Sequence, residues 1–326
     1  MSETSSLAKK ISGGDRRALA KGITIVESTR SDHRDIAAGL LEELLPRTGG
    51  SMRLGISGAP GVGKSTFIES FGNHLIDLGR RVAVLAVDPT SALTGGSILG
   101  DKTRMQTFSM HENVFVRPSP ASGSLGGVTR RTQESLLLCE AAGFDTLIIE
   151  TVGVGQSEIN VADMTDVFLL LLLPLAGDEL QGIKRGITEL ADIILVNKAD
   201  GEQSVLAEQT VNEYRAAMQY VKARYGAWQP VVESCSALEK RGIEQVWQHL
   251  LQMHSSMVAS GEWEAHRAKQ ALAWMWQETS TLVVSDLEND PIVRRLVPAL
   301  EDAVLSGAMP PTVAARRLVD QFKNRV

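Results

Sequence analysis

A glycine-rich segment, residues 54–66, has the clearest potential for chemistry in this chain. Its sequence, LGISGAPGVGKST, fits G-x-x-x-x-G-K-[ST] from Gly58 to Ser65. Glycines let a backbone curl with its N–H groups pointing inward, and these donors, with the positive end of a following helix, can hold phosphate oxygens. Lys64 can reach the β- and γ-phosphates of a nucleotide, and the Ser65 hydroxyl can bind Mg²⁺. The residues predicted to bind the phosphates are Gly58, Pro60, Gly61, Val62, Gly63, Lys64, Ser65 and Thr66.

The residues around this segment supply the strand–loop–helix setting that the motif needs. Apolar Leu54 and Ile56 precede it, and Phe67, Ile68 and Phe71 follow at helical spacing. A chance glycine-rich turn would not require that setting, so the pattern favours a phosphate-binding loop.

A second polar segment, Asn197-Lys198-Ala199-Asp200, follows the apolar run IILV. A carboxylate here can accept hydrogen bonds from both guanine N1–H and the exocyclic amine, a pair of donors that adenine lacks. N-K-x-D alone is usually a polar turn, but downstream of a phosphate loop it resembles the guanine-specificity motif of GTPases. The predicted ligand is therefore GTP or GDP. A further segment resembles the S-A-x element that supports the base in GTPases, and it comprises Ser236, Ala237 and Leu238.

Three acidic residues could complete a magnesium site with Ser65. Asp88 and Glu150 each follow a strand-like run, although an acid at a strand end is often only a cap or a turn former. Asp101 lies in the Gly-rich polar stretch 94–104, which is either a loop that closes over the γ-phosphate or a surface loop without ligand contacts. The sequence predicts metal ligation by Ser65, Asp88, Asp101 and Glu150, and catalytic roles for Lys64 and the three acids.

Alternating strand and helix patterns predict the scaffold for these residues. Apolar runs recur between residues 51 and 260, with helical patterns between most of them, which indicates a mostly parallel sheet flanked by helices. Ligands of such α/β proteins bind at the carboxyl ends of the strands, where all the motifs above fall. The predicted class is a P-loop NTPase. The runs are residues 52–57, 81–87, 114–116, 146–150, 167–173, 193–196 and 231–233.

Helical patterns also occupy both ends of the chain. Residues 1–50 form a helical extension in which Asp15 is a candidate N-cap, residues 51–260 a P-loop GTPase domain, and residues 261–326 a helical arm. The arm opens with a long helix from Glu262 to about residue 287 that holds three of the five tryptophans: Trp263, Trp274 and Trp276. These tryptophans pack either on the chain's own nucleotide domain or on a partner copy, and their abundance favours an oligomer interface.

Composition limits the partners and the location. The chain has 326 residues, 43% of them apolar and 22% charged, and its net charge of −6 offers no broad basic field for nucleic acid. The most apolar run, residues 167–176, is too short to span a bilayer, and the N-terminus lacks an apolar signal core. Cys139 and Cys235 are expected to be buried thiols. We expect a cytoplasmic protein with neither a nucleic-acid nor a membrane partner.

Several longer blocks together resemble the MeaB/ArgK family, relatives of the human MMAA protein within the G3E class of GTPases. They are DPTS from Asp88, TGGSILGDKTRM from Thr94, LLLCEAAGFD from Leu136, ETVGVGQSE from Glu150 and GDELQGIKRG from Gly177, and the likeness covers nearly the whole chain. The resemblance implies a homodimeric GTPase chaperone of adenosylcobalamin-dependent acyl-CoA mutases, notably methylmalonyl-CoA mutase. Such chaperones gate cofactor loading and protect or reactivate the mutase.

The same resemblance implies roles for particular residues. Asp88, Asp101 and Glu150 match the family's metal-site and switch acids, and residues 174–184 match a segment that relays the nucleotide state to the mutase. In Ras-like enzymes a Gln that follows the D-x-x-G glycine orients the attacking water. Here Val154 follows Gly153, and Gln156 comes later. We therefore predict slow intrinsic hydrolysis that a partner accelerates, with Arg104 and Lys184 as candidate cations in cis.

Other classes of GTPase remain as alternatives. The main one is a G3E metallochaperone that inserts metal into another enzyme, but such proteins usually carry a Cys/His cluster for the metal. The two cysteines here are far apart, and His249 and His254 are expected to be surface residues of one helix. A signal-recognition-type GTPase would be expected to carry a D-T-A-G-type block and a basic or Met-rich domain. A kinase would need a protein-substrate site, and N-K-x-D argues against ATP.

Overall fold

The computed structural model describes residues 3–28, 30–87, 106–118, 125–151, 157–174 and 185–323. The predictions made for Asp88, Asp101, Arg104, residues 153–156 and residues 175–184 lie outside the described residues. The chain divides into two units, Met1–Arg267 and Ala268–Val326. The boundaries predicted for the extension, the GTPase domain and the arm stay predictions.

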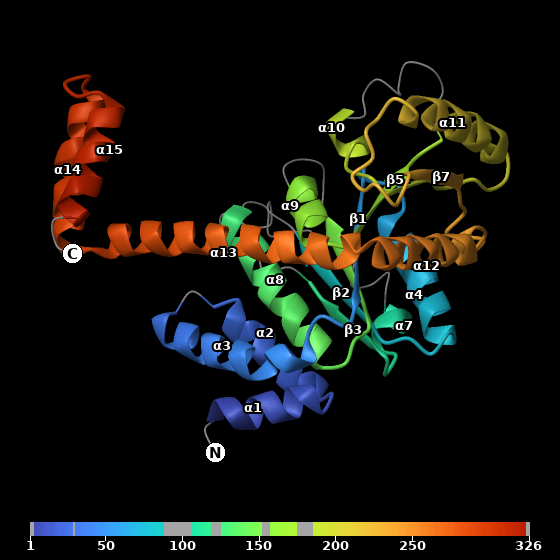
Figure 1. The fold of residues 1–326 in the computed structure, drawn as a ribbon, viewed down its shortest axis with the longest axis horizontal. Coiled ribbons are helices and arrows are strands. Elements are labelled where there is room, and N and C mark those ends of the chain that lie inside the picture. The colour runs from blue at the N-terminus through green and yellow to red at the C-terminus, as the bar shows by residue number, and fades with distance from the viewer. Residues whose placement is uncertain are drawn as a thin grey trace. The chain divides into compact units, whose positions relative to one another are not determined.

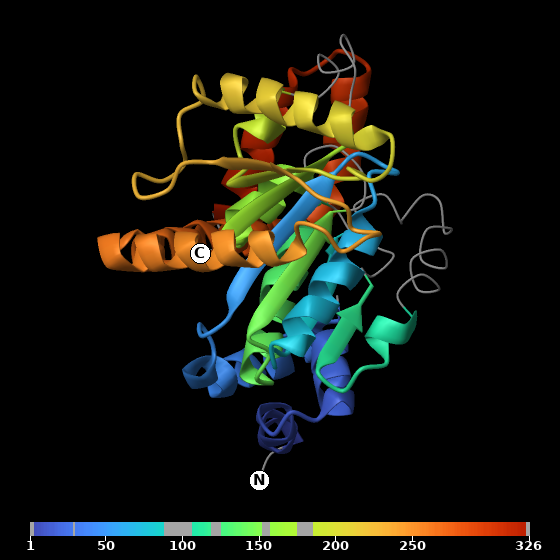
Figure 2. The same ribbon diagram turned by 90° about the vertical axis from the view of Figure 1, so that its right-hand side faces the viewer.

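The first unit is built on a seven-stranded parallel sheet with the order β3-β2-β4-β1-β5-β6-β7 (Figure 1; Figure 2). Each strand coincides with one of the seven predicted apolar runs, to within a residue at either end. The reason is that strands buried on both faces are continuously apolar, a pattern readable from sequence. The strands are β1 Met52–Gly58, β2 Val82–Val87, β3 Val114–Arg117, β4 Thr146–Thr151, β5 Val167–Leu172, β6 Ile193–Val196 and β7 Val231–Ser234.

Helices connect these strands and extend the chain at both ends. In the first unit they are α1 Glu3–Ser12, α2 Arg16–Val26, α3 Ser31–Leu44, the 3₁₀ turn η1 Leu45–Arg47, α4 Lys64–Asp77, α7 Gln106–Ser109, α8 Leu125–Ala141, α9 Ser157–Met164, α10 Arg185–Thr188, α11 Gln203–Met218 and α12 Ile243–Ser260. Helix α13, Glu262–Asn289, begins in the first unit, and α14 Pro291–Leu305 and α15 Pro311–Lys323 belong to the second.

The first unit has two hydrophobic cores, one on each face of the sheet, and successive residues of a strand belong alternately to one and the other. Leu147 and Ile149 of β4 belong to one core, and Ile148 between them belongs to the other. This alternation follows from the two-residue period of side chains along a strand. The first core also contains residues of α1–α3, α8 and α11, whereas the second contains residues of α4 and α12. The phosphate-binding segment therefore enters a helix that packs on the second face.

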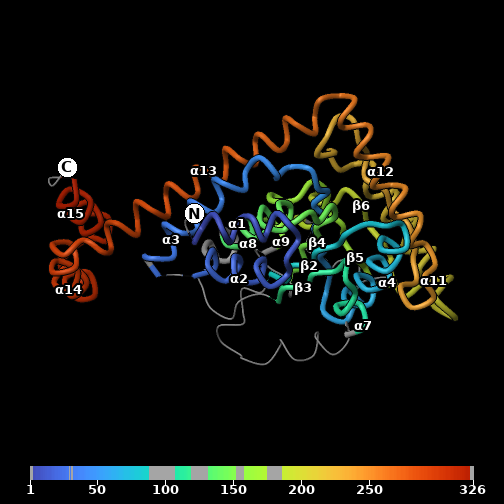
Figure 3. Tube along the Cα trace, turned by 90° about the horizontal axis from the view of Figure 1, so that it is seen from below, coloured from blue at the N-terminus to red at the C-terminus, as the bar shows by residue number. Residues whose placement is uncertain are grey.

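The N-terminal helices pack on one another and on α8 (Figure 3). Asp15 caps α2 as predicted, since its Oδ1 accepts hydrogen bonds from the backbone N–H groups of Arg17 at 2.8 Å and Ala18 at 3.0 Å. These bonds hold the pKa of Asp15 below its ordinary value. At the end of α2, Glu27 pairs with Arg117 at the end of β3. The extension thus covers part of one sheet face.

The predicted long helix at the start of the arm is confirmed as α13, and its tryptophans have different surroundings. Trp263, within the first unit, is 7% exposed, and its ring meets that of His254 at 4.5 Å. His249 and His254, both expected at the surface, are half-buried. Trp276, within the second unit, is 65% exposed. Trp263 therefore packs within the nucleotide unit, as one of the two interpretations expects, whereas an oligomer interface that includes the exposed Trp276 stays a prediction.

Further expectations concern the thiols and the membrane. Cys139 and Cys235 are free and buried, as predicted, and burial raises the pKa of Cys235 to about 12. Among the described residues, no helix has the length and apolar content needed to cross a bilayer.

Candidate functional site

The phosphate-binding segment connects the end of β1 to the start of α4. Gly63, the residue before α4, has φ +96°, and a Cβ placed there would lie 2.7 Å from Asn197 Nδ2. A Cβ on Gly58 would lie 2.6 Å from the carbonyl oxygen of Leu171 in β5. Gly58 has φ +154°, so at both positions the backbone conformation and the close contact exclude a side chain. The result is a loop that fits closely between two neighbouring strands.

Lys64 lies along this loop. Its Nζ donates hydrogen bonds to the carbonyl oxygens of Gly58 at 2.7 Å and Ala59 at 3.3 Å. Lys64 and Ser65 are half-buried at the first turn of α4, where the helix dipole is positive, while Val62 is buried. Lys64 thus places a positive charge beside the backbone amides that would face phosphate. The remaining members of the predicted set, Pro60, Gly61 and Thr66, are exposed.

Asn197 joins this loop to the segment that follows β7. Its buried Nδ2 donates to the carbonyl oxygen of Val62 at 2.9 Å, and its Oδ1 accepts from Ala237 N at 3.0 Å. The Cys235 thiol donates to the same Oδ1 at 3.5 Å. One amide side chain therefore contacts both the predicted phosphate loop, residues 58–66, and the segment 236–241 that contains Ser236, Ala237 and Leu238, which we call the base loop. The structure brings these two sequence motifs together although about 135 residues separate Val62 from Asn197.

Asp200 is held by the other half of the base loop. Its Oδ1 accepts a hydrogen bond from Ser236 Oγ at 2.9 Å, and Ser236 Oγ accepts one from Glu239 N at 3.1 Å. Asp200 is half-buried, whereas Lys198 and Leu238 are exposed. Lys198 has φ +61°, a left-handed conformation that turns the chain sharply between Asn197 and Asp200. The Asp200 carboxylate thus stands at a fixed edge of the loop, where it can accept hydrogen bonds.

One residue of this arrangement was missed from the sequence. The Arg241 guanidinium donates to the carbonyl oxygen of Ala199, and the backbones of Ser236 and Arg241 pair with each other in both directions. Arg241 therefore closes the base loop and joins it to the N-K-x-D segment. No motif marks it, because an arginine that binds a backbone carbonyl needs no particular neighbours in sequence.

The described part of the predicted metal site fits an oxygen-binding cation. Glu150, 6% exposed, lies in β4 between Ile56 of β1 and Ala86 of β2. Its neighbour Thr151 pairs with Val87, the last residue of β2, so Glu150 lies at the carboxyl end of β4 beside the end of β2. Carboxylate and hydroxyl oxygens are ligands that Mg²⁺ accepts. In the described part of the chain, no group of three or more His, Cys, Asp or Glu residues is placed to hold a metal.

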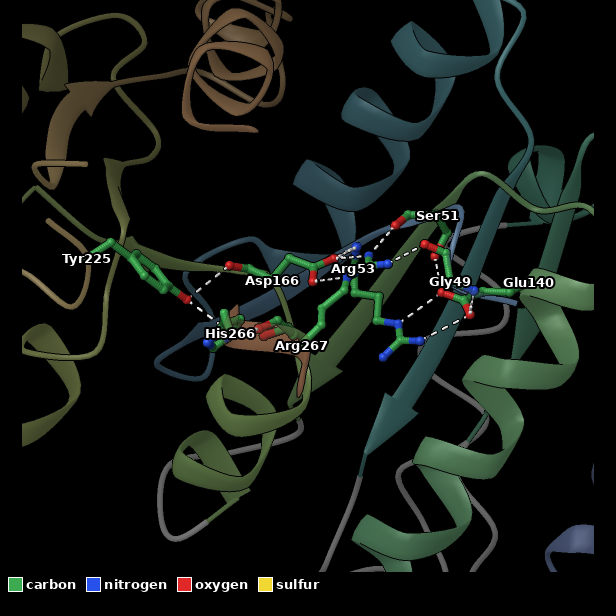
Figure 4. Close-up of polar contacts among 9 residues, drawn as sticks. Gly49, Ser51, Arg53, Glu140, Asp166, Tyr225, His266 and Arg267 are labelled. Carbon is green, nitrogen blue, oxygen red and sulfur yellow. Dashed lines mark hydrogen bonds and ion pairs between the residues drawn. The ribbon is translucent and has the colours of Figure 1, made fainter. Parts of the chain in front are cut away.

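The opposite end of the sheet carries a charged network that sequence reasoning did not find (Figure 4). Glu140, at the end of α8, accepts two hydrogen bonds from Arg53, through Nε and Nη2, each 3.0 Å long. It also accepts from Gly49 N at 2.8 Å and from Ser51 Oγ. Burial alone would raise the pKa of Glu140, but the hydrogen bonds and charge of Arg53, with help from Ser51 and Gly49, lower it below its ordinary value.

Arg267 extends this network to the start of α13. Its Nε donates to Asp166 Oδ1 at 2.8 Å, and its Nη2 donates to Asp166 Oδ2 at 2.7 Å. The Arg267 guanidinium also donates to the carbonyl oxygens of Gly49 and Ser51. The Asp166 side chain is fully buried and accepts a further bond from Arg53 N at 2.8 Å. Arg267 thus fixes the first turns of α13 to the segments that enter β1 and β5.

The family model described as "Methylmalonyl Co-A mutase-associated GTPase MeaB" matches residues 19–291 of the chain. The chain belongs to the MeaB family of GTPases. The match spans the phosphate loop, the N-K-x-D segment and the base loop. The prediction of a guanine-nucleotide hydrolase is confirmed at the level of this family.

Several relatives have sequences that align with most of this chain. A Mycobacterium bovis protein named as a probable GTPase is 51% identical over 314 residues, which cover 96% of this chain and 94% of the relative. The mitochondrial methylmalonic aciduria type A homolog of Mus musculus is 47% identical, covering 96% of this chain and 78% of its own length. The GTPase ArgK of Escherichia coli is 44% identical, with 91% of each protein covered.

A solved structure shows the same architecture. The crystal structure of a LAO/AO transport system kinase aligns with a TM-score of 0.76 and 36% sequence identity, covering 99% of both chains. Together with the family match and the parallel sheet, this similarity confirms the predicted class, a P-loop GTPase fold with flanking helices.

Proposed function

We propose that this MeaB-family protein hydrolyses GTP to GDP and phosphate with Mg²⁺, and that it acts as a chaperone of a cobalamin-dependent acyl-CoA mutase. The observation that carries the nucleotide part is the position of Asn197, whose amide contacts both Val62 and Ala237. This side chain sets the phosphate-binding and base-binding loops beside each other. A single guanosine nucleotide is a ligand that would engage both loops.

At the phosphate end, backbone amides of residues 58–66 and the N-terminus of α4 receive the phosphate oxygens. Lys64 compensates the negative charge that develops on the transferred phosphoryl group. Its Nζ is hydrogen-bonded to two carbonyl oxygens of the loop and would exchange these bonds for phosphate oxygens. The backbone donors belong to the loop itself, which lowers the reorganisation needed in the transition state.

At the base end, Asp200 accepts from guanine N1–H and the exocyclic amine. Ser236 holds one of its oxygens, and Lys198, Ala237 and Leu238 form the remainder of the base site. Adenine presents an acceptor at its N1, so a fixed carboxylate there would repel it. A site whose hydrogen-bonding groups stay unpaired with the wrong base discriminates strongly.

Ser65 and Glu150, with Asp88 and Asp101, are the residues that would hold Mg²⁺, directly or through water. When bound, the cation would supply positive charge beside the phosphate groups. Glu150 is buried near the carboxyl end of β4, so the fold holds its side chain in place, as a residue that would help to hold a cation requires.

The partner assignment rests on the family. We propose an adenosylcobalamin-dependent acyl-CoA mutase as client, with residues 174–184 in communication between nucleotide and mutase and with a homodimer as the working form. Gated cofactor loading and protection of the mutase follow from the same assignment. Hydrolysis is slow in the isolated protein and faster when the client orders the segments beside the phosphates. The cytoplasmic location and the absence of nucleic-acid and membrane partners stay predictions.

Calorimetry with GTP, GDP and ATP, with and without Mg²⁺, tests the nucleotide assignment. We expect tight binding of GTP and GDP and at least a hundredfold weaker binding of ATP, by analogy with sites that read donors. Equal affinity for ATP and GTP, or no binding of either nucleotide with Mg²⁺ present, would contradict the proposal. Titration with nickel and zinc in the same instrument tests the metallochaperone alternative.

Pull-down with candidate acyl-CoA mutases tests the client assignment. The GTPase rate is recorded for the isolated protein and for each mixture. One mutase should bind and raise the rate by roughly tenfold or more, as partners of switch GTPases do. A rate in isolation that equals the rate in every mixture would refute partner activation.

A further inference from the structure

Among the described residues, Ser70 is a buried helical hydroxyl whose hydrogen bond leads out of its own helix. It is the seventh residue of α4, is 8% exposed, and donates to the carbonyl oxygen of Ala237 at 2.6 Å. A Ser or Thr inside a helix normally donates to the carbonyl four residues earlier. Thr210 of α11 and Thr165, just after α9, do this at 2.9 Å and 2.8 Å. Ser70 instead reaches a loop that lies 167 residues away in sequence.

The bond from Ser70 completes a ring of hydrogen bonds. Ala237 N donates to Asn197 Oδ1 at 3.0 Å, and Asn197 Nδ2 donates to the carbonyl oxygen of Val62 at 2.9 Å. From Val62 the chain runs through Lys64 into α4 and returns to Ser70. Ala237 is therefore held from both sides, through its N–H by Asn197 and through its carbonyl by Ser70. The ring contains the phosphate loop, the phosphate-binding helix and the base loop.

The surroundings of Ser70 keep water away from this bond. Ala237 is 3% exposed, and it belongs with Phe67, Phe71 and Trp247 to the hydrophobic core on the α4 face. A buried carbonyl that loses its donor cannot readily replace it with water. Without the Ser70 hydroxyl, the Ala237 carbonyl oxygen would lack its donor, and the base loop would therefore move relative to α4.

We infer that Ser70 is a positioning residue that sets the separation between the phosphate-binding helix and the guanine-binding loop, and thereby sharpens selection of the guanine base. This inference rests on the proposed guanosine-nucleotide site. Ser70 is not among the residues proposed to bind the nucleotide. It acts through its hydrogen bond to the backbone carbonyl oxygen of Ala237. Ala237 itself belongs, with Ser236 and Leu238, to the segment proposed to support the base.

Inosine diphosphate is the probe that separates positioning from general stability. It lacks the exocyclic amine, so Asp200 can form only one of its two bonds with the base. The ratio of GDP affinity to inosine diphosphate affinity therefore reports how well the carboxylate is aligned. A shifted base loop lowers this ratio, whereas a uniformly weakened protein lowers both affinities and keeps the ratio.

The test measures both affinities by calorimetry in the full chain with Ser70→Ala, Ser70→Thr and Thr210→Val. In Ser70→Ala we expect GDP affinity to fall about fivefold to tenfold and the ratio to fall about threefold, the range for one neutral hydrogen bond. Ser70→Thr keeps the hydroxyl and should keep most of the ratio. Thr210→Val removes a buried hydroxyl bonded within its own helix, and it should change neither quantity.

Several outcomes overturn the inference. An unchanged ratio in Ser70→Ala, or the same fall in Thr210→Val, would leave Ser70 without a positioning role. Should Ser70→Ala fail to fold, Ser70→Cys, with a donor of similar size but weaker strength, gives the same comparison. If the unaltered protein itself does not prefer GDP to inosine diphosphate, the proposed guanine site fails. A clear preference in that protein, kept in Ser70→Ala, refutes only the inference on Ser70.

Discussion

The two ends of the parallel sheet are stabilised by different kinds of bond. Around the predicted nucleotide site, at the carboxyl ends of β1, β6 and β7, neutral groups of Asn197, Ser236 and Ser70 hold the loops together with the Arg241 guanidinium, which donates to a backbone carbonyl oxygen, and the charged Lys64 and Asp200 are half-buried. At the amino ends, charged groups pair with one another, as in Arg53–Glu140 and Arg267–Asp166, with both carboxylate side chains at most 1% exposed.

This difference separates recognition from anchoring. A charged side chain that is engaged in an internal ion pair is less available to a charged ligand. Amides and hydroxyls are therefore suited to holding the loops of such a site. Charges that are buried without a ligand must instead be paired and hydrogen-bonded, or they destabilise the fold. We therefore expect substitutions at the amino ends to change stability with little effect on nucleotide selection, and substitutions at the carboxyl ends to do the reverse.

The largest effect is expected for Arg267→Ala. This change leaves the buried Asp166 carboxylate without its main cation, and breaking such a pair costs about 3–5 kcal/mol of unfolding free energy. Urea denaturation monitored by circular dichroism measures the loss. The matched control is Arg30→Ala, which breaks the exposed Arg30–Asp32 pair and should cost at most about 1 kcal/mol. A GDP to inosine diphosphate ratio that changed in Arg267→Ala would argue against the separation of the two ends.

Lys64→Ala should show the opposite behaviour to Arg267→Ala: a large loss of hydrolysis with little change in stability. Without the ammonium group the developing phosphoryl charge loses a preorganised donor, so the hydrolysis rate should fall about a hundredfold to a thousandfold. Phosphate release in the presence of Mg²⁺ measures the rate, and urea denaturation should show little change. Lys9→Ala, an exposed lysine of α1, is the control and should match the unaltered protein. Hydrolysis within threefold of the original would remove Lys64 from the mechanism.

What could be read from the sequence follows the same division. The segment from Gly58 to Ser65 and the N-K-x-D turn are local patterns, because phosphate and guanine recognition each need several groups within a few residues. Continuous apolar runs fixed the strands for a similar local reason. The anchoring pairs have no such signal: Asp166 and Arg267 lie 101 residues apart, and each is an ordinary charged residue in its own neighbourhood. Ser70 and Arg241 were missed for the same reason.

An intermediate effect is expected at the base. Asp200→Asn replaces an acceptor by an amide that can also donate, so preference should move from GTP toward xanthosine triphosphate, whose base presents an additional oxygen. The change in the ratio of the two affinities should be roughly tenfold to a hundredfold, since a buried group would otherwise stay unpaired. Glu202→Gln, an exposed acid nearby, is the control. An unchanged preference would count against the assignment of Asp200 to guanine.

The smallest effect concerns acid stability at the amino ends. The pKa of Glu140 is lowered in the folded protein from its ordinary value of 4.5, so its ion pair contributes stability above that value. This contribution is lost as the pH falls through the pKa that Glu140 has in the folded protein, because the carboxyl group is then protonated in both the folded and the unfolded protein. Glu140→Gln should therefore be less stable than the original at pH 7, and the difference should shrink below about pH 4.5. Urea denaturation at a series of pH values measures it.

Glu233→Gln provides the comparison for this last prediction. Glu233 pairs with Arg215 at 3.0 Å, but both side chains are more than a third exposed, so solvent screens the pair. Its removal should change stability little at any pH. A difference between Glu140→Gln and the original protein that stayed constant from pH 7 down to pH 3 would show that the Glu140 charge is not what stabilises the amino ends. Ser51 and Gly49 donate to different oxygens of Glu140, and a glutamine keeps only one acceptor oxygen, so the loss of one of these hydrogen bonds would then account for the difference.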